Sequence, residues 1–564
     1  MRTGKVVVWC GFALVIFCLW GLIHLGNFLT PGSAPLPVNP LEMILAFMYD
    51  RAVWPAATTW LLILGSTIFL VGLVLWAVKP QANTRPRNAH KKSTSRMSSP
   101  SHVRRIQERA RTRELAQLHP DLVGHGAPGL HLGKILVGDR GWVYQGFRQC
   151  SVHVWAPGRG KTFGEVVRHS YYAPGAYMLT MNKVDGIREV IALRQAAHPA
   201  GRIWVFDQQN IFRKASRPAF TINLLAGITN SEEAHDLAVI FETANVVESD
   251  KGDKQFDSQG RDFLAWCILA AAITPTGTLS DVFDWVSGED FTTPYDILHQ
   301  TGRHRGAAAS LFGMSRQPDR TRGSVAASAQ RMASPMVHDR LMQWVTPQPG
   351  IPEFEPDHFI TSKDTLLMLS EESAGTVTAF VSALVEAVLN ACKREAQRRG
   401  GRLPLPLVAD LDECGNVVKL KKLPDWYTYF GSMGIVVSSY WQSKSQGVAL
   451  FGESRWKLLW DSAGVKVYGG GSDDTEWLRM LAALFGKYDK PITTSQHSGG
   501  ITTSHSSSTR ETDVITVAEL ADLPEWHAVV RTSNGVSTMI KIIPSFEDPE
   551  LMKILSRAPE INYV

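Results

Sequence analysis

The chain has 564 residues, with 58 Lys+Arg, 53 Asp+Glu and a formal net charge of +5. The charge is unevenly distributed: residues 1–113 hold 14 basic and 3 acidic residues, for a net +11, and residues 114–564 hold 44 and 50, for a net −6. This distribution excludes a uniformly basic protein that coats nucleic acid. With 44% hydrophobic and 20% charged residues the chain is not disordered, and its length predicts two to four domains.

Two apolar runs near the N-terminus predict membrane helices at about residues 6–25 and 60–78. Each run is close to the ~20 residues that a helix needs to cross the apolar core of a bilayer. The first is longer than the apolar part of a typical signal peptide and lacks a clear cleavage pattern, so we expect a retained anchor over residues 1–79.

Charges around these runs predict the topology. The connecting segment 27–59 carries only Glu42, Asp50 and Arg51, whereas residues 79–113 carry eleven Lys/Arg. Since Lys and Arg accumulate on the cytoplasmic side, both termini of this multi-pass protein are expected in the cytoplasm. Residues 80–128 are predicted to be a basic, flexible juxtamembrane linker, whose charge favours topology and lipid contact over DNA binding.

Six cysteines lie at positions 10, 18, 150, 267, 392 and 414, without CxxC spacing. A disulfide framework or a zinc site is therefore not expected, and a reducing compartment fits the body of the chain.

A glycine-rich turn follows the apolar strand predicted at 152–156. Its residues are Ala156, Pro157, Gly158, Arg159, Gly160, Lys161 and Thr162, and a helix is predicted at 163–169. Strand, Gly-rich turn, Lys-Thr and helix form the phosphate-binding loop of P-loop NTPases. We therefore predict that residues 156–162 bind ATP, with Lys161 on the phosphates and Thr162 on Mg²⁺. One departure stands out: Trp155 occupies the place of the usual first Gly, and the turn is one residue shorter.

A second strand, predicted at 404–411, ends in Asp412 and Glu413. A P-loop ATPase needs such a strand to bring a carboxylate to the metal. We predict that Asp412 holds Mg²⁺ and that Glu413 polarises the attacking water. A third strand at 434–439 precedes Gln442, a polar residue placed to sense the γ-phosphate. Residues 182–185 match the guanine-reading NKxD pattern, but they precede Asp412 by far, so GTP specificity is not expected.

These elements, behind two N-terminal apolar runs, resemble the type IV coupling proteins, the TraG/TraD-like ATPases of conjugation and type IV secretion. Further segments are similar to the actinobacterial-type members, and together the resemblance covers most of residues 130–545. The similar segments are Thr180–Asp185, Ile203–Gln208, Leu411–Glu413, Gln442–Ser443, Val465–Asp474 and Asp513–Val530.

The resemblance implies an α/β fold: a RecA-like P-loop domain over 129–229 and 350–564, with an all-α insertion over 230–349. That insertion accounts for the 251 residues between Lys161 and Asp412. Seven arginines against two aspartates at 303–340 offer a basic patch that could meet DNA phosphates, although a solvated helical face is nearly as good an interpretation. The polar tract 493–512 is expected to be a flexible loop.

The function implied is a membrane-anchored ATPase of the bacterial plasma membrane that recruits and moves DNA or a DNA–protein substrate into a type IV secretion channel. A relaxase or another secretion substrate, the channel components and a homo-hexamer are the implied partners. Two alternatives stay open at this stage. One is an FtsK-like or type VII secretion ATPase, and the other is a membrane-tethered cargo receptor that does not hydrolyse ATP.

Overall fold

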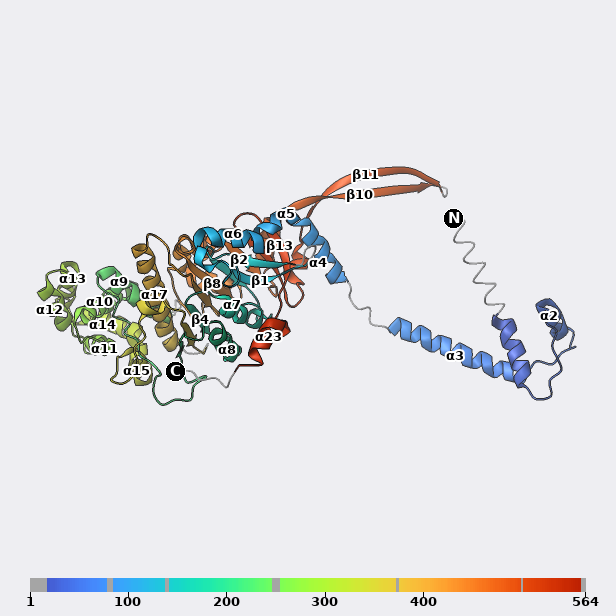
Figure 1. The fold of residues 1–564 in the computed structure, drawn as a ribbon, viewed down its shortest axis with the longest axis horizontal. Helices are drawn as coiled ribbons and strands as arrows, with labels where there is room; N and C mark the ends of the chain where they lie inside the picture. Colours follow the sequence, from blue (N-terminus) through green and yellow to red (C-terminus); the bar gives the residue numbers. More distant parts are fainter. Residues whose placement is uncertain are drawn as a thin grey trace. The chain divides into compact units, whose positions relative to one another are not determined.

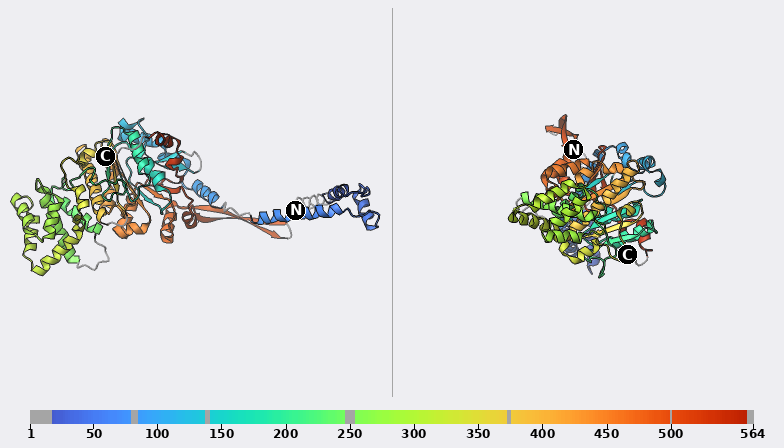
Figure 2. Two further views of the ribbon diagram at one scale, coloured as in Figure 1. Left: turned by 90° about the horizontal axis from the view of Figure 1, so that it is seen from below. Right: turned by 90° about the vertical axis from the view of Figure 1, so that its left-hand side faces the viewer.

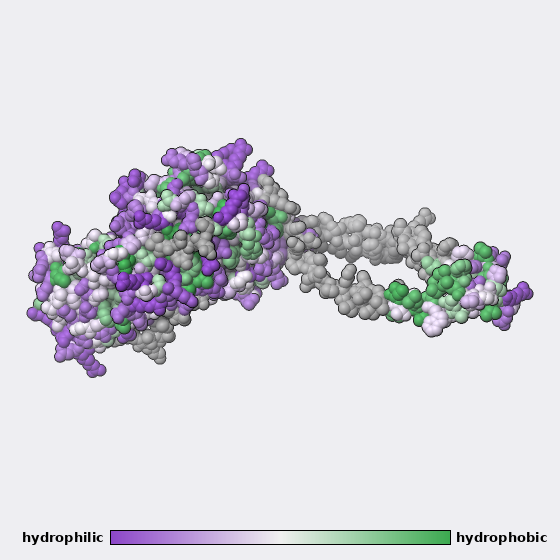
Figure 3. Space-filling model, turned by 60° about the horizontal axis from the view of Figure 1, so that its bottom comes forward, coloured by the Kyte–Doolittle hydropathy of each residue, from purple (hydrophilic) through white to green (hydrophobic). Residues whose placement is uncertain are grey.

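The computed structural model describes residues 18–78, 85–136, 141–245, 254–371, 375–498 and 501–558. The chain divides into two compact units, Met1–Thr84 and Arg85–Val564 (Figure 1). Unit 1 contains a helix over residues 18–29, the short helix α2 (Pro40–Met48) and the longer α3 (Ala56–Val78). Apolar side chains are exposed on its surface (Figure 3). Leu41, Trp60 and Leu64 are among the exposed residues of this unit.

The two membrane helices predicted from the sequence are not confirmed. Residues 6–17 of the first lie outside the described part of the chain, and within that part only shorter apolar helices, 18–29 and 56–68, occur in unit 1. The one described helix that is long and apolar enough to cross a membrane is Thr376–Arg398, and 78% of its apolar window is buried in unit 2. It is therefore a core helix of unit 2.

Unit 2 is built on one eleven-stranded sheet in the order β2-β1-β13-β12-β9-β3-β8-β7-β4-β6-β5. From β9 to β5 the neighbouring strands are parallel, and from β2 to β9 they are antiparallel. The bounds are β1 Leu130–Ile135, β2 Trp142–Gln145, β3 Ser151–Val154, β4 Tyr177–Met181, β5 Ile203–Phe206, β6 Thr365–Leu369, β7 Leu407–Leu411, β8 Ile435–Trp441, β9 Val465–Tyr468, β12 His527–Thr532 and β13 Ser537–Lys541.

The parallel strands are buried along their whole length, as expected for a sheet covered on both faces. The covering helices include α7 (Val167–Tyr172), α8 (Ile187–Ala197), α17 (Gly375–Arg398), α20 (Glu453–Ser462), α21 (Thr475–Phe485) and α23 (Pro549–Leu555). Because parallel strands end at one edge, the residues that follow β3, β7 and β8 are brought together there.

A helical region interrupts the body between β5 and β6 and gathers at one end of unit 2 (Figures 1 and 2). Its helices are α9 Ser231–Asn245, α10 Lys254–Ile273, α11 Leu279–Ser287, α12 Thr292–Thr301, α13 Arg305–Ser315, α14 Asp319–Ala333 and α15 Asp339–Val345. No strand occurs among the described residues of 231–345, and α9 packs on α17 of the body.

Two segments differ from what the sequence predicts. Much of the supposed flexible linker 80–128 forms α4 (Arg85–Arg96), α5 (Pro100–Val103) and α6 (Glu108–Leu118), which are tied to the body. Ile106 is fully buried, and Ser98 N donates to Ser537 O at 3.1 Å. The tract 493–512 lies in the hairpin β10 (Lys487–Ser498) and β11 (Ile501–Asp513), which extends away from the rest of unit 2 (Figure 2). Threonine-rich sequence supports extended pairing as readily as a loop.

Candidate nucleotide site

The glycine-rich turn begins where β3 ends. Trp155 N donates to Trp441 O at 2.9 Å, and Ala156 N donates to Gly470 O at 3.2 Å, so the turn starts from a fixed point between two neighbouring strand ends. Gly158 and Gly160 have φ of +75° and +90°, conformations that favour glycine. Within the described residues, the N–H groups of Gly158, Gly160 and Lys161 donate to no acceptor. Backbone N–H groups left free in a glycine-rich turn are the donors that bind anions in phosphate sites.

The unusual Trp155 has a packing role. Its side chain is 1% exposed, and a Cβ added at Gly469 would lie 2.1 Å from Cε3 of its ring. Gly469, directly after β9, therefore makes room for the indole that replaces the usual first glycine of the turn. The departure from the P-loop pattern is compensated across the sheet and leaves Gly158 and Gly160 free to shape the turn.

Asp412 and Glu413 follow β7, and both face Lys161. Lys161 Nζ lies 3.0 Å from Asp412 Oδ1 and also pairs with Glu413. Glu413 has a left-handed φ of +53°, an unusual conformation that turns its side chain out of the strand direction. Its second carboxylate oxygen accepts a 2.6 Å hydrogen bond from Nε2 of Gln442, which directly follows β8. The four residues predicted to act chemically thus form one connected cluster.

Burial and charge act against each other in this cluster. Burial disfavours the charged ammonium, but the carboxylates of Asp412 and Glu413 outweigh it and raise the pKa of Lys161. Burial raises the pKa of Asp412, with the neighbouring Glu413 adding to the effect and Lys161 opposing it. A divalent cation beside Asp412 would favour its charged form.

Thr162 and Arg159 of the turn have different surroundings. Thr162 begins the helical turn η3 (Thr162–Val166, of π type) and is half-buried, with its methyl group 3.3 Å from where a Cβ on Gly186 would lie. Arg159 instead donates to backbone oxygens of Leu523 and Gly469, the latter at 3.3 Å. Arg159 therefore ties the turn to the C-terminal part of the body. The NKxD stretch 182–185 follows β4 and leads into Gly186, beside Thr162.

Sequence reasoning missed a buried polar layer beneath the turn. His169 on α7 lies 3.2 Å from Asp410 of β7, whose other oxygen accepts a 2.8 Å hydrogen bond from Tyr177 of β4. His153 of β3 lies 2.8 Å from Glu165 in η3, and all these side chains are fully buried. Burial lowers the pKa of His169, but Asp410 outweighs it and the net pKa is raised. These residues come from three strands, from η3 and from α7, so the layer can be recognised only after the strands are paired.

Within the described residues no cluster of three or more His, Cys, Asp or Glu is arranged to hold a metal ion. Mg²⁺ in phosphate-transfer sites uses one or two carboxylates and takes its other ligands from water and phosphate. Asp412 and Glu413 are the carboxylates beside Lys161, and Thr162 is the hydroxyl residue that follows it in the chain.

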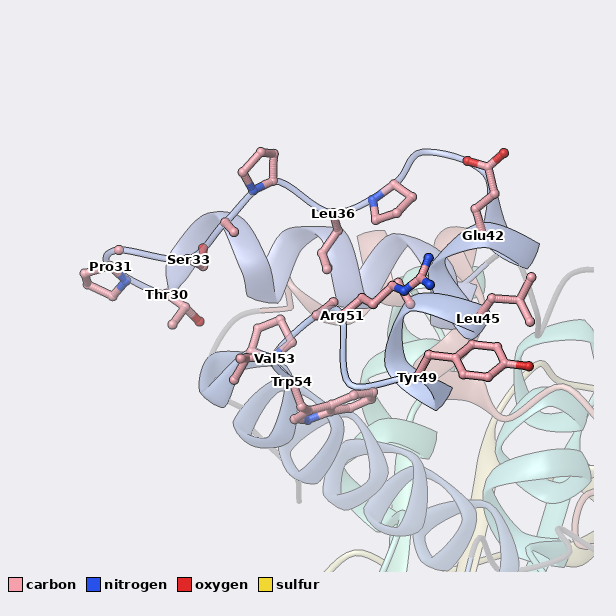
Figure 4. Close-up of a pocket in the computed structure, with 17 residues that line it drawn as sticks. Thr30, Pro31, Ser33, Leu36, Glu42, Leu45, Tyr49, Arg51, Val53 and Trp54 are labelled. Atoms are coloured by element: carbon pink, nitrogen blue, oxygen red, sulfur yellow. The ribbon is translucent and has the colours of Figure 1, made fainter.

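Two hollows are lined by other residues. The larger, about 890 Å³, is in unit 1 and is lined mainly by apolar residues with Glu42 and Arg51 (Figure 4). The smaller, about 100 Å³, lies between α9 and α17 and contains Glu386 and Arg394. Neither contains a residue of the phosphate-binding turn.

Comparisons with known proteins give a family match. Residues 406–525, which include Asp412, Glu413 and Gln442, match the family described as the TraM recognition site of TraD and TraG. The structure of the bacterial conjugative coupling protein TrwBdeltaN70 in its unbound monoclinic form is 18% identical, with a TM-score of 0.50 over 70% of this chain and 84% of that chain. The family match is confined to residues 406–525, and the likeness to TrwBdeltaN70 shows a shared fold.

Two further coupling-protein structures are similar at lower scores. TrwB in complex with the non-hydrolysable ATP analogue ADPNP is 16% identical, with a TM-score of 0.47, covering 70% of this chain and 86% of that chain. TrwB in complex with ADP and Mg²⁺ is 17% identical, with a TM-score of 0.46, covering 71% and 85%. The comparison with curated proteins gives no match. The α/β fold of unit 2 is similar to that of TrwBdeltaN70.

Proposed function

We propose that this chain is a type IV coupling protein, an ATPase that uses ATP hydrolysis to move DNA, or a DNA–protein complex, in conjugation or type IV secretion. The observation that carries the proposal is the convergence of Lys161, Asp412, Glu413 and Gln442 at the ends of three neighbouring parallel strands. A cation, two carboxylates and an amide beside a cradle of free N–H groups are the parts that phosphoryl transfer to water requires.

ATP and Mg²⁺ fit the residues present. The turn 156–162 would hold the phosphates, with Lys161 on their terminal oxygens, and Thr162 and Asp412 would hold Mg²⁺. When bound, Mg²⁺ supplies positive charge that neutralises the phosphate oxygens. Lys161 now pairs with Asp412 and Glu413, so it would exchange these partners for phosphate oxygens when nucleotide enters.

Glu413 is then free to take a proton. Released from Lys161, its carboxylate accepts a hydrogen bond from the attacking water and removes a proton as the water attacks. Gln442 keeps the Glu413 carboxylate oriented through their 2.6 Å hydrogen bond, and the left-handed backbone of Glu413 fixes its direction. Because Glu413 is buried, few water molecules other than the attacking one reach it.

The substrate follows from the family and from the helical insertion. The matching family is described by recognition of TraM, and TrwB is named a conjugative coupling protein, which favours a relaxosome, with a relaxase on its DNA, as cargo. Exposed arginines on α13 and α14, among them Arg316 and Arg320, suit DNA phosphates. The insertion between β5 and β6 also favours this function over an FtsK-like or type VII translocase.

The proposed location is the bacterial plasma membrane. The apolar runs at 6–25 and 60–78 and the basic residues after Val78 support a two-helix anchor with both termini in the cytoplasm. A homo-hexamer is proposed from the family resemblance, with an arginine of a neighbouring subunit completing each site and the secretion channel receiving the cargo.

The test is ATP binding and hydrolysis by the full-length chain in detergent micelles, comparing wild type with Lys161→Ala. Lys183→Ala is the matched control, since Lys183 is an exposed lysine in the loop that leads to Gly186. We expect wild type and Lys183→Ala to hydrolyse ATP and Lys161→Ala to have lost both binding and turnover. ATP binding without turnover in wild type would instead support the alternative of a non-hydrolysing cargo receptor.

A further inference from the structure

Three aromatic side chains line up beside the phosphate-binding turn. Phe163 directly follows Thr162, and its ring centroid lies 6.0 Å from that of Phe546. Phe546 lies 5.9 Å from Trp526 in an edge-to-face arrangement. Trp526 packs on the turn itself: a Cβ added at Gly160 would lie 2.3 Å from Cζ3 of its ring. Phe163, Trp526 and Phe546, here named the aromatic row, come from three separate parts of the sequence.

The fold holds this row firmly in place. Arg168, on the helix that follows the turn and 1% exposed at its side chain, pairs with Asp548 and donates to Ile543 O at 2.8 Å. These contacts bracket Phe546 and fix the segment 543–548 against α7. Trp526 has a left-handed φ of +59°, and its carbonyl oxygen accepts from Ile542 N at 2.8 Å. A strained backbone kept by surrounding contacts is common at ligand sites.

The row is also open to solvent. Phe546 is 53% exposed, and Phe163 and Trp526 are half-buried. Among the described residues of unit 2, the only other large exposed aromatic side chain is Phe312, and the Arg316 guanidinium lies over its ring at 4.2 Å. Phe546 thus differs from Phe312, because no cation of the described part of the chain lies over its exposed ring.

We propose that the aromatic row stacks on the base of the nucleotide whose phosphates the turn holds; this rests on the proposed function. Phosphates held over residues 158–162 leave the nucleoside to run past the first turn of the following helix, where the Phe163 side chain begins the row. Stacking uses the face of a base and ignores its hydrogen-bonding edge. The site therefore prefers purine over pyrimidine nucleotides, because purines have the larger face, and discriminates little between adenine and guanine.

The test measures dissociation constants of ATP, CTP and inorganic tripolyphosphate for the full-length chain, in wild type and Phe546→Ala. We expect Phe546→Ala to weaken ATP about 10-fold, the effect of losing one base–aromatic stack, and to narrow the difference between ATP and CTP. Tripolyphosphate has no base, so its dissociation constant should not change. Phe546→Tyr should keep wild-type affinity, and Phe312→Ala is the matched exposed control in the helical insertion.

Phe546→Leu is the second variant, because it keeps apolar volume and loses the aromatic face; it should also weaken ATP. Unchanged ATP affinity in both variants, or an equal loss for ATP and tripolyphosphate, would overturn the proposal. If Lys161→Ala abolishes ATP binding while Phe546→Ala has no effect, only the stacking proposal fails. If wild type binds neither ATP nor tripolyphosphate, the proposed function fails and the stacking proposal falls with it.

Discussion

Charged side chains serve opposite purposes in the parallel half of the sheet and in the helical insertion. Beside the sheet, Lys161, Asp412 and Glu413 are largely buried and satisfy one another. On the insertion, Arg303, Arg305, Arg320 and Arg340 are exposed, and no described residue forms an ion pair with them. These charged side chains are thus buried and paired in one region, and exposed without a described ion-pair partner in the other.

This difference in burial determines how strongly the charges interact with each other and with a ligand. Buried charges interact strongly because water does not screen them, and they exchange partners only when a ligand brings new charge. Exposed arginines interact weakly with one another but together attract a polyanion in a salt-dependent way. We therefore propose that ATP hydrolysis and cargo contact take place in separate regions of the protein, a separation that single substitutions can test.

Glu413→Gln tests the buried region most severely. The amide keeps the shape but accepts no proton, so ATP turnover should fall by about 10²–10⁴-fold. ATP binding should persist, since Lys161 no longer faces two carboxylates. Steady-state hydrolysis and equilibrium ATP binding measure the two effects, with Glu453→Gln, an exposed glutamate, as control. Equal turnover in both variants would contradict the role assigned to Glu413.

Arg168→Leu tests whether buried charges also stabilise the body. Its ion pair with Asp548 and its position 4.7 Å over the Trp142 ring would both be lost, at a cost of about 3–5 kcal/mol to the free energy of unfolding. Thermal unfolding of the full chain should show a clear decrease in Tm, and Arg188→Leu, exposed on α8, should show little. The combined Arg168→Leu, Asp548→Asn variant removes the unpaired charge and keeps a side-chain oxygen for the N-cap bonds of α23. If it is no more stable than Arg168→Leu alone, the pairing is contradicted.

Glu386 tests the boundary between the two regions, where α17 meets α9. Burial raises its pKa to about 7, while Lys422 opposes the shift and Asp236 adds to it. A carboxyl with a raised folded-state pKa stabilises the protein below its unfolded value near 4.5, and this contribution is lost as the pH rises through 7. The total is about 3 kcal/mol.

Glu386→Gln should therefore gain stability relative to wild type as the pH rises from 4.5 to 7. Urea unfolding at a series of pH values measures this difference, with Glu232→Gln, exposed on α9, as control. A constant difference between Glu386→Gln and wild type over that range would rule out the titration.

The smallest effect concerns the exposed arginines. Replacing Arg316 and Arg320 by alanine should weaken DNA binding severalfold and reduce the slope of log affinity against log salt by about 2. Arg331→Ala is the matched control, because Arg331 is already paired with Asp257 at 2.7 Å. Fluorescence anisotropy with labelled duplex at several salt concentrations gives both values. An unchanged slope would show that Arg316 and Arg320 do not contact the DNA phosphates.

How much of this could be read from the sequence depends on how local each feature is. Asp412 and Gln442 directly follow apolar strands, and Lys161 lies in the turn after another. Because parallel strands end at the same edge of a sheet, the sequence predicts that the three residues meet. The compensation between Trp155 and Gly469, and the contact of Trp526 with Gly160, join residues more than 300 positions apart. Nothing in either local sequence signals its partner.

Local composition also misled in two places. Residues 85–118 are polar and basic enough to suggest a flexible linker, yet a few apolar residues such as Val103 and Ile106 reach the core and hold the helices on the body. The Ser/Thr-rich tract 493–512 satisfies its backbone hydrogen bonds by pairing β10 with β11. The composition of a segment indicates how much conformational entropy it loses on becoming ordered. The contacts that offset this loss are made with residues elsewhere in the chain.

The central claim is that one nucleotide site hydrolyses ATP to act on DNA. Its most direct test is the ATP turnover rate of the full-length chain in detergent micelles, with and without duplex DNA, for wild type and Glu413→Gln. We predict that DNA raises wild-type turnover severalfold and leaves Glu413→Gln near zero. Turnover that ignores DNA, or that survives in Glu413→Gln, would contradict the account.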